Sequence, residues 1–292
     1  ITTEARVTAS FKVRLNTKPT GNVTFSLTSS DISEGTVSPS SLTFTPSNWN
    51  TDQVVTITGV DDYVADGDIS YSIVTGVVSS TDANYNGKNP ADVSVTNTDN
   101  DVAGFTVTPT AGLITKEAGD GDTFKIRLKS QPLSDVTVAL SSSNTSEGLV
   151  SPTSVTFTST NWNTDQTVTV TGVDDDIDDG DVAYQIITNP ATSSDPAYSG
   201  KNPADVSVTN IDDDEAKIIV NPVGGLTTSE AGKTDLFKVV LQTRPTANVI
   251  LTLYSSNTNE GTISASSLTF TPSNWNLQQE VVVTGVDDDI DD

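Results

Sequence analysis

The sequence predicts an all-β protein, built from tandem immunoglobulin-like, seven-stranded antiparallel β-sandwich domains in an elongated array. Three observations predict this fold class. A 113-residue unit repeats without insertion or deletion, as the spacing of Trp49, Trp162 and Trp275 shows. Short runs of alternating apolar and polar residues, typical of half-buried strands, fill each unit between turn-forming segments. No stretch has the pattern of a long helix.

The repeat divides the chain into three copies. Residues 1–102 form a first copy without its opening strand, 103–215 a complete second copy, and 216–292 a third copy without its last strands. Because the segments missing from the two end copies differ, neither end can complete the other. We therefore expect the chain to be a piece of a longer array.

The complete second copy contains seven predicted strands. In the second of them Phe124, Ile126 and Leu128 point to one face, while the basic residues between them point to the other. Seven short strands in about 100 residues are typical of an immunoglobulin-like sandwich. The seven lie at 105–107, 124–128, 136–140, 155–157, 168–170, 184–186 and 206–208.

Composition excludes several classes of function. The formal net charge is -25, from 39 acidic and 14 basic residues, which disfavours nucleic acid and anionic membranes as partners. Cysteine, histidine and methionine are absent, so disulfides, thiolate sites and histidine-based catalysis are excluded. No apolar run reaches the roughly 20 residues that cross a bilayer, so we expect no direct membrane insertion. We expect a protein that is not an enzyme.

The acidic residues concentrate in a few loops. If successive strands run antiparallel, the loops after strands one, three and five and the end of strand seven share one end of the sandwich. We call this end the acidic pole; the opposite end receives only Asp135, Asp165, Asp195 and Asp205. In the second copy the acidic pole comprises Glu117, Asp120, Asp122, Glu147, Asp174, Asp175, Asp176, Asp178, Asp179, Asp181, Asp212, Asp213 and Asp214.

Converging carboxylates favour a hard divalent cation. Calcium takes six to eight oxygen ligands in an irregular shell, whereas magnesium demands a near-ideal octahedron, so Ca²⁺ is the first choice and Mg²⁺ the second. The alternative is an acidic surface that serves only solubility. The predicted metal ligands are Glu4, Asp61, Asp62, Asp66, Asp99 and Asp101 in the first copy, Glu117, Glu147, Asp174, Asp175, Asp176, Asp178, Asp179, Asp212, Asp213 and Asp214 in the second, and Glu230, Asp287, Asp288 and Asp289 in the third.

The early glutamate, the segment VTVTGVDDDIDDGD and the terminal DDD together resemble the Calx-beta module of sodium/calcium exchangers and large bacterial surface proteins. The resemblance covers the whole unit and implies calcium at one pole, at the junction with the next domain. The glutamates that follow the paired aspartates in that family are not matched here, which leaves the number of ions per junction open. The ligands it implies are Glu117, Asp174, Asp175, Asp179 and Asp212 to Asp214.

These observations predict a structural calcium-binding repeat of a long extracellular bacterial adhesin, fibre or filament, with Ca²⁺ between domains stiffening the rod. The expected partners are neighbouring repeats of the chain, with lateral or filament self-assembly a further possibility. The alternatives are an adhesive or glycan-binding module that presents recognition loops, and a Ca²⁺-sensor domain pair. Because Tyr63, Ala65 and Asn100 replace three second-copy aspartates, we expect fewer or weaker ions at the first junction. The three tryptophans are expected either to close one end of each core or to form an aromatic platform.

Overall fold

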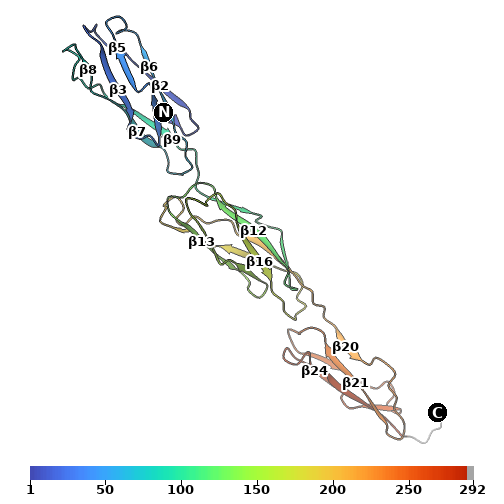
Figure 1. Ribbon diagram of the computed structural model, residues 1–292. Coiled ribbons are helices and arrows are strands. Elements are labelled where there is room, and N and C mark those ends of the chain that lie inside the picture. Colours follow the sequence, from blue (N-terminus) through green and yellow to red (C-terminus); the bar gives the residue numbers. More distant parts are fainter. Residues whose placement is uncertain (288–292) are drawn as a thin grey trace.

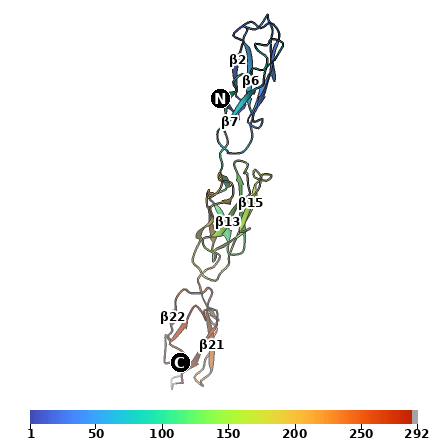
Figure 2. The ribbon, with the colours of Figure 1, turned by 90° about the vertical axis from the view of Figure 1, so that its left-hand side faces the viewer.

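The structure, a computed structural model, describes residues 1–287 of the 292. The described part of the chain is all-β: it contains strands and turns and no helix. Figures 1 and 2, two perpendicular views, show three β-sandwich bodies arranged end to end, with the N-terminus on the first and the C-terminus on the last. The buried apolar side chains form three separate cores, one in each copy of the repeat.

The second copy shows the complete arrangement. One of its sheets has the strand order β10-β12-β16-β14, and the other has the order β11-β19-β17-β13-β15, with β18 paired to β13. Its strands are β10 (Phe105–Thr108), β11 (Leu113–Lys116), β12 (Gly121–Leu128), β13 (Val136–Ser142), β14 (Gly148–Ser151), β15 (Ser154–Phe157), β16 (Gln166–Gly172), β17 (Val182–Thr188), β18 (Thr192–Ser193) and β19 (Val206–Ile211).

The other two copies have the same order over the strands they contain. The first copy consists of β1 (Thr2–Thr3), β2 (Thr8–Val13), β3 (Val23–Ser29), β4 (Gly35–Ser38), β5 (Ser41–Phe44), β6 (Gln53–Gly59), β7 (Ile69–Thr75), β8 (Ser79–Ser80) and β9 (Val93–Thr98). The third consists of β20 (Ile218–Asn221), β21 (Thr234–Leu241), β22 (Val249–Thr252), β23 (Gly261–Ile263), β24 (Ser267–Phe270) and β25 (Gln279–Gly285).

The β-sandwich prediction is confirmed, and each of the seven predicted strands of the second copy lies within an observed one. The count of seven is too low, because β11, β14 and β18 are also present. β11 and β14 do not alternate apolar and polar residues in step with burial, since Ile114 and Leu149 are exposed, and β18 has only two residues. The sheets are also not wholly antiparallel, since β11 pairs with β19 in parallel.

The first predicted strand, 105–107, lies within β10, and a further strand that was not predicted, β11, follows it in the other sheet. β10 pairs antiparallel with β12 in one sheet, and after a short break β11 joins the other sheet beside β19. Pro109, which has no N–H to donate to a ladder, follows β10 directly and lies in that break. The split keeps the acidic pole intact, because β11 ends one residue before Glu117.

The core of the second copy is filled by the inward residues of both sheets, and Phe124, Ile126 and Phe157 are fully buried. Tyr198, from the long loop between β18 and β19, closes the end of this core opposite the acidic pole. Its hydroxyl donates to the backbone carbonyl of Ser130 at 2.6 Å, and its ring lies 5.9 Å from that of Phe105. This loop therefore has a structural role in packing.

Two glycines allow close approaches near the acidic pole. A side chain at Gly172 would collide with the backbone carbonyl of Lys116 and with the side chain of Asn210. A side chain at Gly148 would collide with the hydroxyl of Tyr184. Both contacts let the loops around the pole pack directly against the ends of the strands.

Candidate metal centre

Three carboxylates meet where two strands of the second copy end. Glu117 follows β11, and Asp212 and Asp214 follow β19. Each of these three residues offers a carboxylate oxygen, and the three oxygens lie within 4.8 Å of one another. The parallel pairing of β11 with β19 brings the two strand ends side by side, so the sheet itself assembles this group.

Backbone hydrogen bonds hold the group in place. The N–H of Glu117 donates to the carbonyl of Ile211 at 3.1 Å, and the N–H of Asp213 donates to the Glu117 carboxylate at 3.4 Å. The N–H groups of Asp214 and Gly180 donate to the carboxylate of Asp212 at 2.8 and 2.7 Å. The last of these bonds ties the aspartate-rich loop between β16 and β17 to the end of β19.

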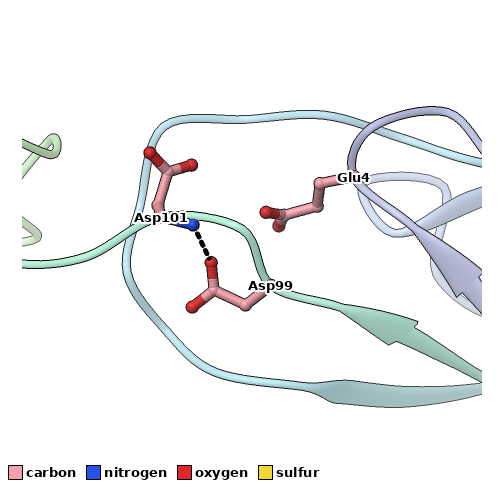
Figure 3. Close-up of side chains that lie close together, drawn as sticks. All are labelled: Glu4, Asp99 and Asp101. Atoms are coloured by element: carbon pink, nitrogen blue, oxygen red, sulfur yellow. Dashed lines mark hydrogen bonds between the residues drawn. The ribbon is translucent and has the colours of Figure 1, made fainter.

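The first copy has the same arrangement, shown in Figure 3. Glu4, Asp99 and Asp101 have carboxylate oxygens within 4.8 Å of one another. The N–H of Asp101 donates to Asp99 at 2.6 Å, the bond drawn in the figure, and the N–H of Asn100 donates to Glu4 at 3.0 Å.

A second group of carboxylates lies beside the first. In the first copy it consists of Glu34, Asp62 and Asp66, whose oxygens also lie within 4.8 Å of one another. Glu34 was missed by the sequence analysis, although it lies 113 residues before the predicted Glu147 and the repeat alone could have found it. Glu147 is buried and accepts a hydrogen bond from the side chain of Asn210 at 3.4 Å.

Burial and like charge make these carboxylates unusual acids. The side chains of Glu4 and Glu117 are each only 3% exposed. Burial, reinforced by the negative charges of neighbouring aspartates, raises the pKa of each to about 7. Burial first and aspartate charge second also raise the pKa of Glu147.

Asp212 differs from its neighbours. Burial opposes the ionisation of this side chain, but the N–H groups of Asp214 and Gly180 outweigh that effect and lower its pKa. The pKa of Asp214 is raised, first by burial and then by the charge of Asp212 and other aspartates. The group therefore combines one firmly ionised carboxylate with two that resist ionisation.

The donor set fits a hard cation. Every side chain in these groups offers oxygen, as Ca²⁺ prefers. One carboxylate oxygen of Asp101 and one of Asp214 are buried without any hydrogen-bond partner, which is costly for a polar atom unless something else satisfies it. Two oxygens bound to one Ca²⁺ at about 2.3–2.6 Å lie no further apart than twice that distance. The oxygens of these groups lie within 4.8 Å of one another and so satisfy this limit.

The acidic pole faces the next copy. The N–H of Ala216, in the connecting segment, donates to the carboxylate of Asp178 at 2.7 Å. The N–H of Arg244, in the third copy, donates to the carbonyl of Asp176 at 2.6 Å. Both bonds join the aspartate-rich loop of the second copy to the body that follows it.

The first junction is built in the same way, with one difference. The N–H of Gln131 donates to the carbonyl of Tyr63 at 2.6 Å, and Gln131 forms a parallel β-bridge with Val64. Gln131 and Arg244 are 113 residues apart and so occupy equivalent positions. At this junction the ring of Tyr63 lies 5.8 Å from that of Trp162, so an aromatic contact replaces the carboxylate of Asp176.

The tryptophans serve in packing, and one also lies at a junction. Trp162 and Trp275 are partly buried and pack against the second and third cores. Trp162 additionally contacts the preceding copy through Tyr63.

The predicted ligands are not all brought together. Among residues 1–287, the carboxylates of Glu147, Asp175 and Asp179 do not form a group within 4.8 Å as their first-copy counterparts do, although the charges of Asp175 and Asp179 raise the pKa of Glu147. The charges of Asp174, Asp176 and Asp213 raise the pKa of Asp214. Asp61 lies at the edge of the first-copy pole, where its carboxylate accepts a hydrogen bond from Asn100 at 3.3 Å.

The third copy is different. Glu230 and Asp287 are exposed, and among residues 1–287 neither belongs to a three-carboxylate group. Glu230 shares a surface hollow with Glu260, the counterpart of Glu34 and Glu147. Asp288 and Asp289 lie outside the described residues.

No helix in the described part of the chain is long and apolar enough to cross a membrane. No protein-family model matches the sequence, and no curated protein matches it.

The chain is similar in structure to several solved β-sandwich proteins. The calcium binding domain CBD12 of CALX1.1 has 15% identity and a TM-score of 0.36, over 71% of this chain and 95% of that one. CBD12 of CALX1.2 has 14% identity and a TM-score of 0.34, over 72% and 95%. Domains 4 and 5 of the S-layer protein SbsC have 18% identity and a TM-score of 0.30, over 64% and 77%. Similarity of this degree concerns the all-β fold alone.

Proposed function

We propose that this chain is a structural calcium-binding repeat, in which Ca²⁺ at each acidic pole fixes one domain against the next. The domains are 1–102, 103–215 and 216–292, and they are Calx-beta-like. The observation that carries the proposal is that buried carboxylates from separate loops meet at the pole, and that this pole is hydrogen-bonded to the following copy.

The physical reasoning is electrostatic. Without a cation, burial and mutual repulsion raise the pKa of Glu117 to about 7 and also raise that of Asp214, and one oxygen of Asp214 has no partner. A bound Ca²⁺ would remove the repulsion and satisfy that oxygen. In the second copy the ion would be held by Glu117, Asp212 and Asp214, and in the first copy by Glu4, Asp99 and Asp101. A second ion-binding site would be offered by Glu147, Asp175 and Asp179 and their counterparts.

The stiffening follows from where these ligands are attached. The loop that carries Asp175 and Asp179 also carries Asp176 and Asp178, which bond to the third copy. Fixing this loop to the strand ends therefore restricts the angle between two bodies. Extracellular calcium modules bind at about 10⁻⁴–10⁻³ M. At millimolar calcium each site then contributes about 0.4–1.4 kcal/mol by mass action.

These affinities match calcium outside cells, and the absence of cysteine and the repeated rod architecture suit an extracellular bacterial adhesin, fibre or filament. The partners are the neighbouring repeats, with lateral self-assembly a further step in this proposal. The role is one of structure and binding, without catalysis.

The test is small-angle scattering of the 292-residue chain with calcium, with chelator, and with chelator and excess magnesium, beside calorimetry of calcium binding. We expect calcium binding and a narrow distribution of maximum dimensions only when calcium is present. An Asp165→Asn variant, altered at the opposite pole, should behave like the parent chain. A chain that is equally stiff in calcium and in chelator would contradict the proposal.

The rival roles give other results in the same experiments. A glycan or partner protein that binds equally well in chelator would favour a recognition module. A large change of shape over a narrow range of calcium concentration would favour a sensor.

The two junctions should differ. The carboxylate of Asp178 bonds to Ala216 at the second junction, and its first-copy counterpart is Ala65, which has no carboxylate; the backbone bond of Asp176 has its equivalent at Tyr63. We expect fewer or weaker ions at the first junction. Titration of Glu4→Gln and Glu117→Gln variants separates the two contributions, and equal stoichiometry and affinity at both junctions would contradict this expectation.

A further inference from the structure

The chain passes through the second copy from one pole to the other. It enters beside β10, where the N–H of Lys129 donates to the carbonyl of Gly104, close to the junction with the first copy. It leaves at the end of β19, directly into Asp212 at the opposite, acidic pole. Tension along a tandem array therefore pulls β10 and β19 in opposite directions, along the axis of the sandwich (Figure 1).

The parallel pair of β11 and β19 lies between these two points. β11 is connected through β10 to the preceding copy, and β19 is connected directly to the following copy. Because the two strands are parallel, tension makes them slide past each other, and their hydrogen bonds, which run across the pull, are strained together. A pair loaded at one end in a hairpin would instead open one bond at a time.

The ladder between the two strands is longer than the named strands. It starts with the N–H of Ser207 donating to Thr110 and ends with the N–H of Glu117 donating to Ile211, at 3.0 and 3.1 Å. Inside it, the hydroxyl of Thr115 donates to the side chain of Asn210 at 2.9 Å, and both residues are buried.

Glu117 lies at the end of this ladder on the β11 side, and Asp212 and Asp214 lie at its end on the β19 side. Sliding by a single residue moves the strands by about 3.3 Å relative to each other. That displacement exceeds the 2.3–2.6 Å length of a calcium–oxygen bond, so sliding and simultaneous coordination by both strands are incompatible.

From this geometry we infer that the β11–β19 pair is the force-bearing clamp of the domain, and that a cation held by Glu117, Asp212 and Asp214 locks the clamp against sliding. The cation part rests on the proposed function; the clamp itself rests on strand direction alone. The first copy repeats the device, with β1 parallel to β9 and Glu4 directly after β1.

The test is single-molecule force spectroscopy at constant load on the full chain, held by its ends. The chain has no cysteine, so the paired residues of β11 and β19 can be replaced as Ile114→Cys with Thr209→Cys. The disulfide that these two cysteines form on oxidation should prevent the long extension that accompanies unfolding of the second copy, and its reduction should restore that extension. The result identifies which unfolding event belongs to that copy.

If the ion must dissociate before the clamp ruptures, calcium at about ten times the dissociation constant should lengthen the lifetime of the folded second copy under load about tenfold. Glu117→Gln should abolish the gain for the second copy and leave that of the first; Glu4→Gln should do the reverse. Asp165→Asn, whose carboxylate pairs with Lys125 and Arg127 at the opposite pole, should retain both gains.

These outcomes distinguish the calcium-locked clamp from the proposed function. Calcium binding in calorimetry with no change in lifetime, or an equal gain in the Glu117→Gln variant, overturns the locked clamp and leaves the proposed function standing. No calcium binding at all overturns both. In chelator, the clamp predicts that pulling the chain by its ends, which slides β11 against β19, gives the second copy a longer lifetime than pulling apart the directly paired residues 114 and 209; the opposite order refutes it.

Discussion

Calcium binding to this chain should depend strongly on pH between 6 and 8. The perturbation is protonation of Glu4 and Glu117, whose pKa burial and neighbouring aspartates raise to about 7. A metal ligand must be ionised to bind, so protons compete with calcium. With a pKa of about 7, the ionised fraction falls from about nine-tenths at pH 8 to about one-tenth at pH 6.

The apparent affinity of each site should therefore fall about tenfold between pH 8 and pH 6. An ordinary glutamate, with a pKa near 4.5, is ionised throughout this range and would give almost no change. At pH 7 binding should also release about half a proton per site, taken up by the buffer.

The assay is isothermal titration of calcium at pH 6, 7 and 8, in two buffers that differ in ionisation enthalpy. The variant with Glu4→Gln and Glu117→Gln should bind more weakly but lose the pH dependence, and Asp165→Asn should keep it. An affinity that stays constant from pH 6 to 8, or binding without proton release, would refute the reasoning.

The same pKa values determine whether the calcium-free chain becomes more or less stable as the pH rises. A carboxyl group whose pKa is higher in the folded than in the unfolded state stabilises the fold when protonated. That stabilisation is present in full below about pH 4.5 and is lost as the pH rises to about 7. Calcium-free protein should thus become less stable over the range in which calcium binding becomes tighter, which urea titrations at each pH would show.

Three further substitutions test other parts of the structure. Tyr63→Ala removes the contact with Trp162 and should broaden the distance distribution across the first junction alone, measured between paired spin labels; no broadening would contradict the contact. Tyr198→Phe leaves the carbonyl of Ser130 without its donor and should cost about 1–3 kcal/mol in urea unfolding, and a neutral result would mean that water replaces the hydroxyl. Gly148→Ala places a methyl group against a buried tyrosine hydroxyl and should destabilise the second copy by about 1–3 kcal/mol; unchanged stability would show that the loop can move aside.

The sequence by itself determined the architecture. The 113-residue period, the alternating strands and the direction of successive strands were enough to predict sandwiches and to place Glu117, the aspartate-rich loop and Asp212 at one pole. The repeat and the alternation are periodic, and the direction of each strand follows from its place in the order of strands, so all of these can be read from the sequence. The parallel strand β11 could not be predicted in this way, because an exposed Ile114 lies between the buried Leu113 and Thr115, so apolar and polar residues do not alternate with burial. Its pairing partner, β19, also lies about 95 residues further along the chain.

Only the tertiary structure decided which carboxylates are buried together. Glu117, Asp120 and Asp122 are close in sequence, yet Glu117 joins the buried group, Asp120 pairs with Lys116 in solvent, and Asp122 accepts the N–H of Ile114. Burial and hydrogen bonding depend on residues brought together from distant strands, so they bury Glu117 and raise its pKa, while Asp120 stays exposed and Asp122 half-buried. The same holds for the junctions, where backbone bonds from the next copy single out loop residues that the sequence alone could not rank.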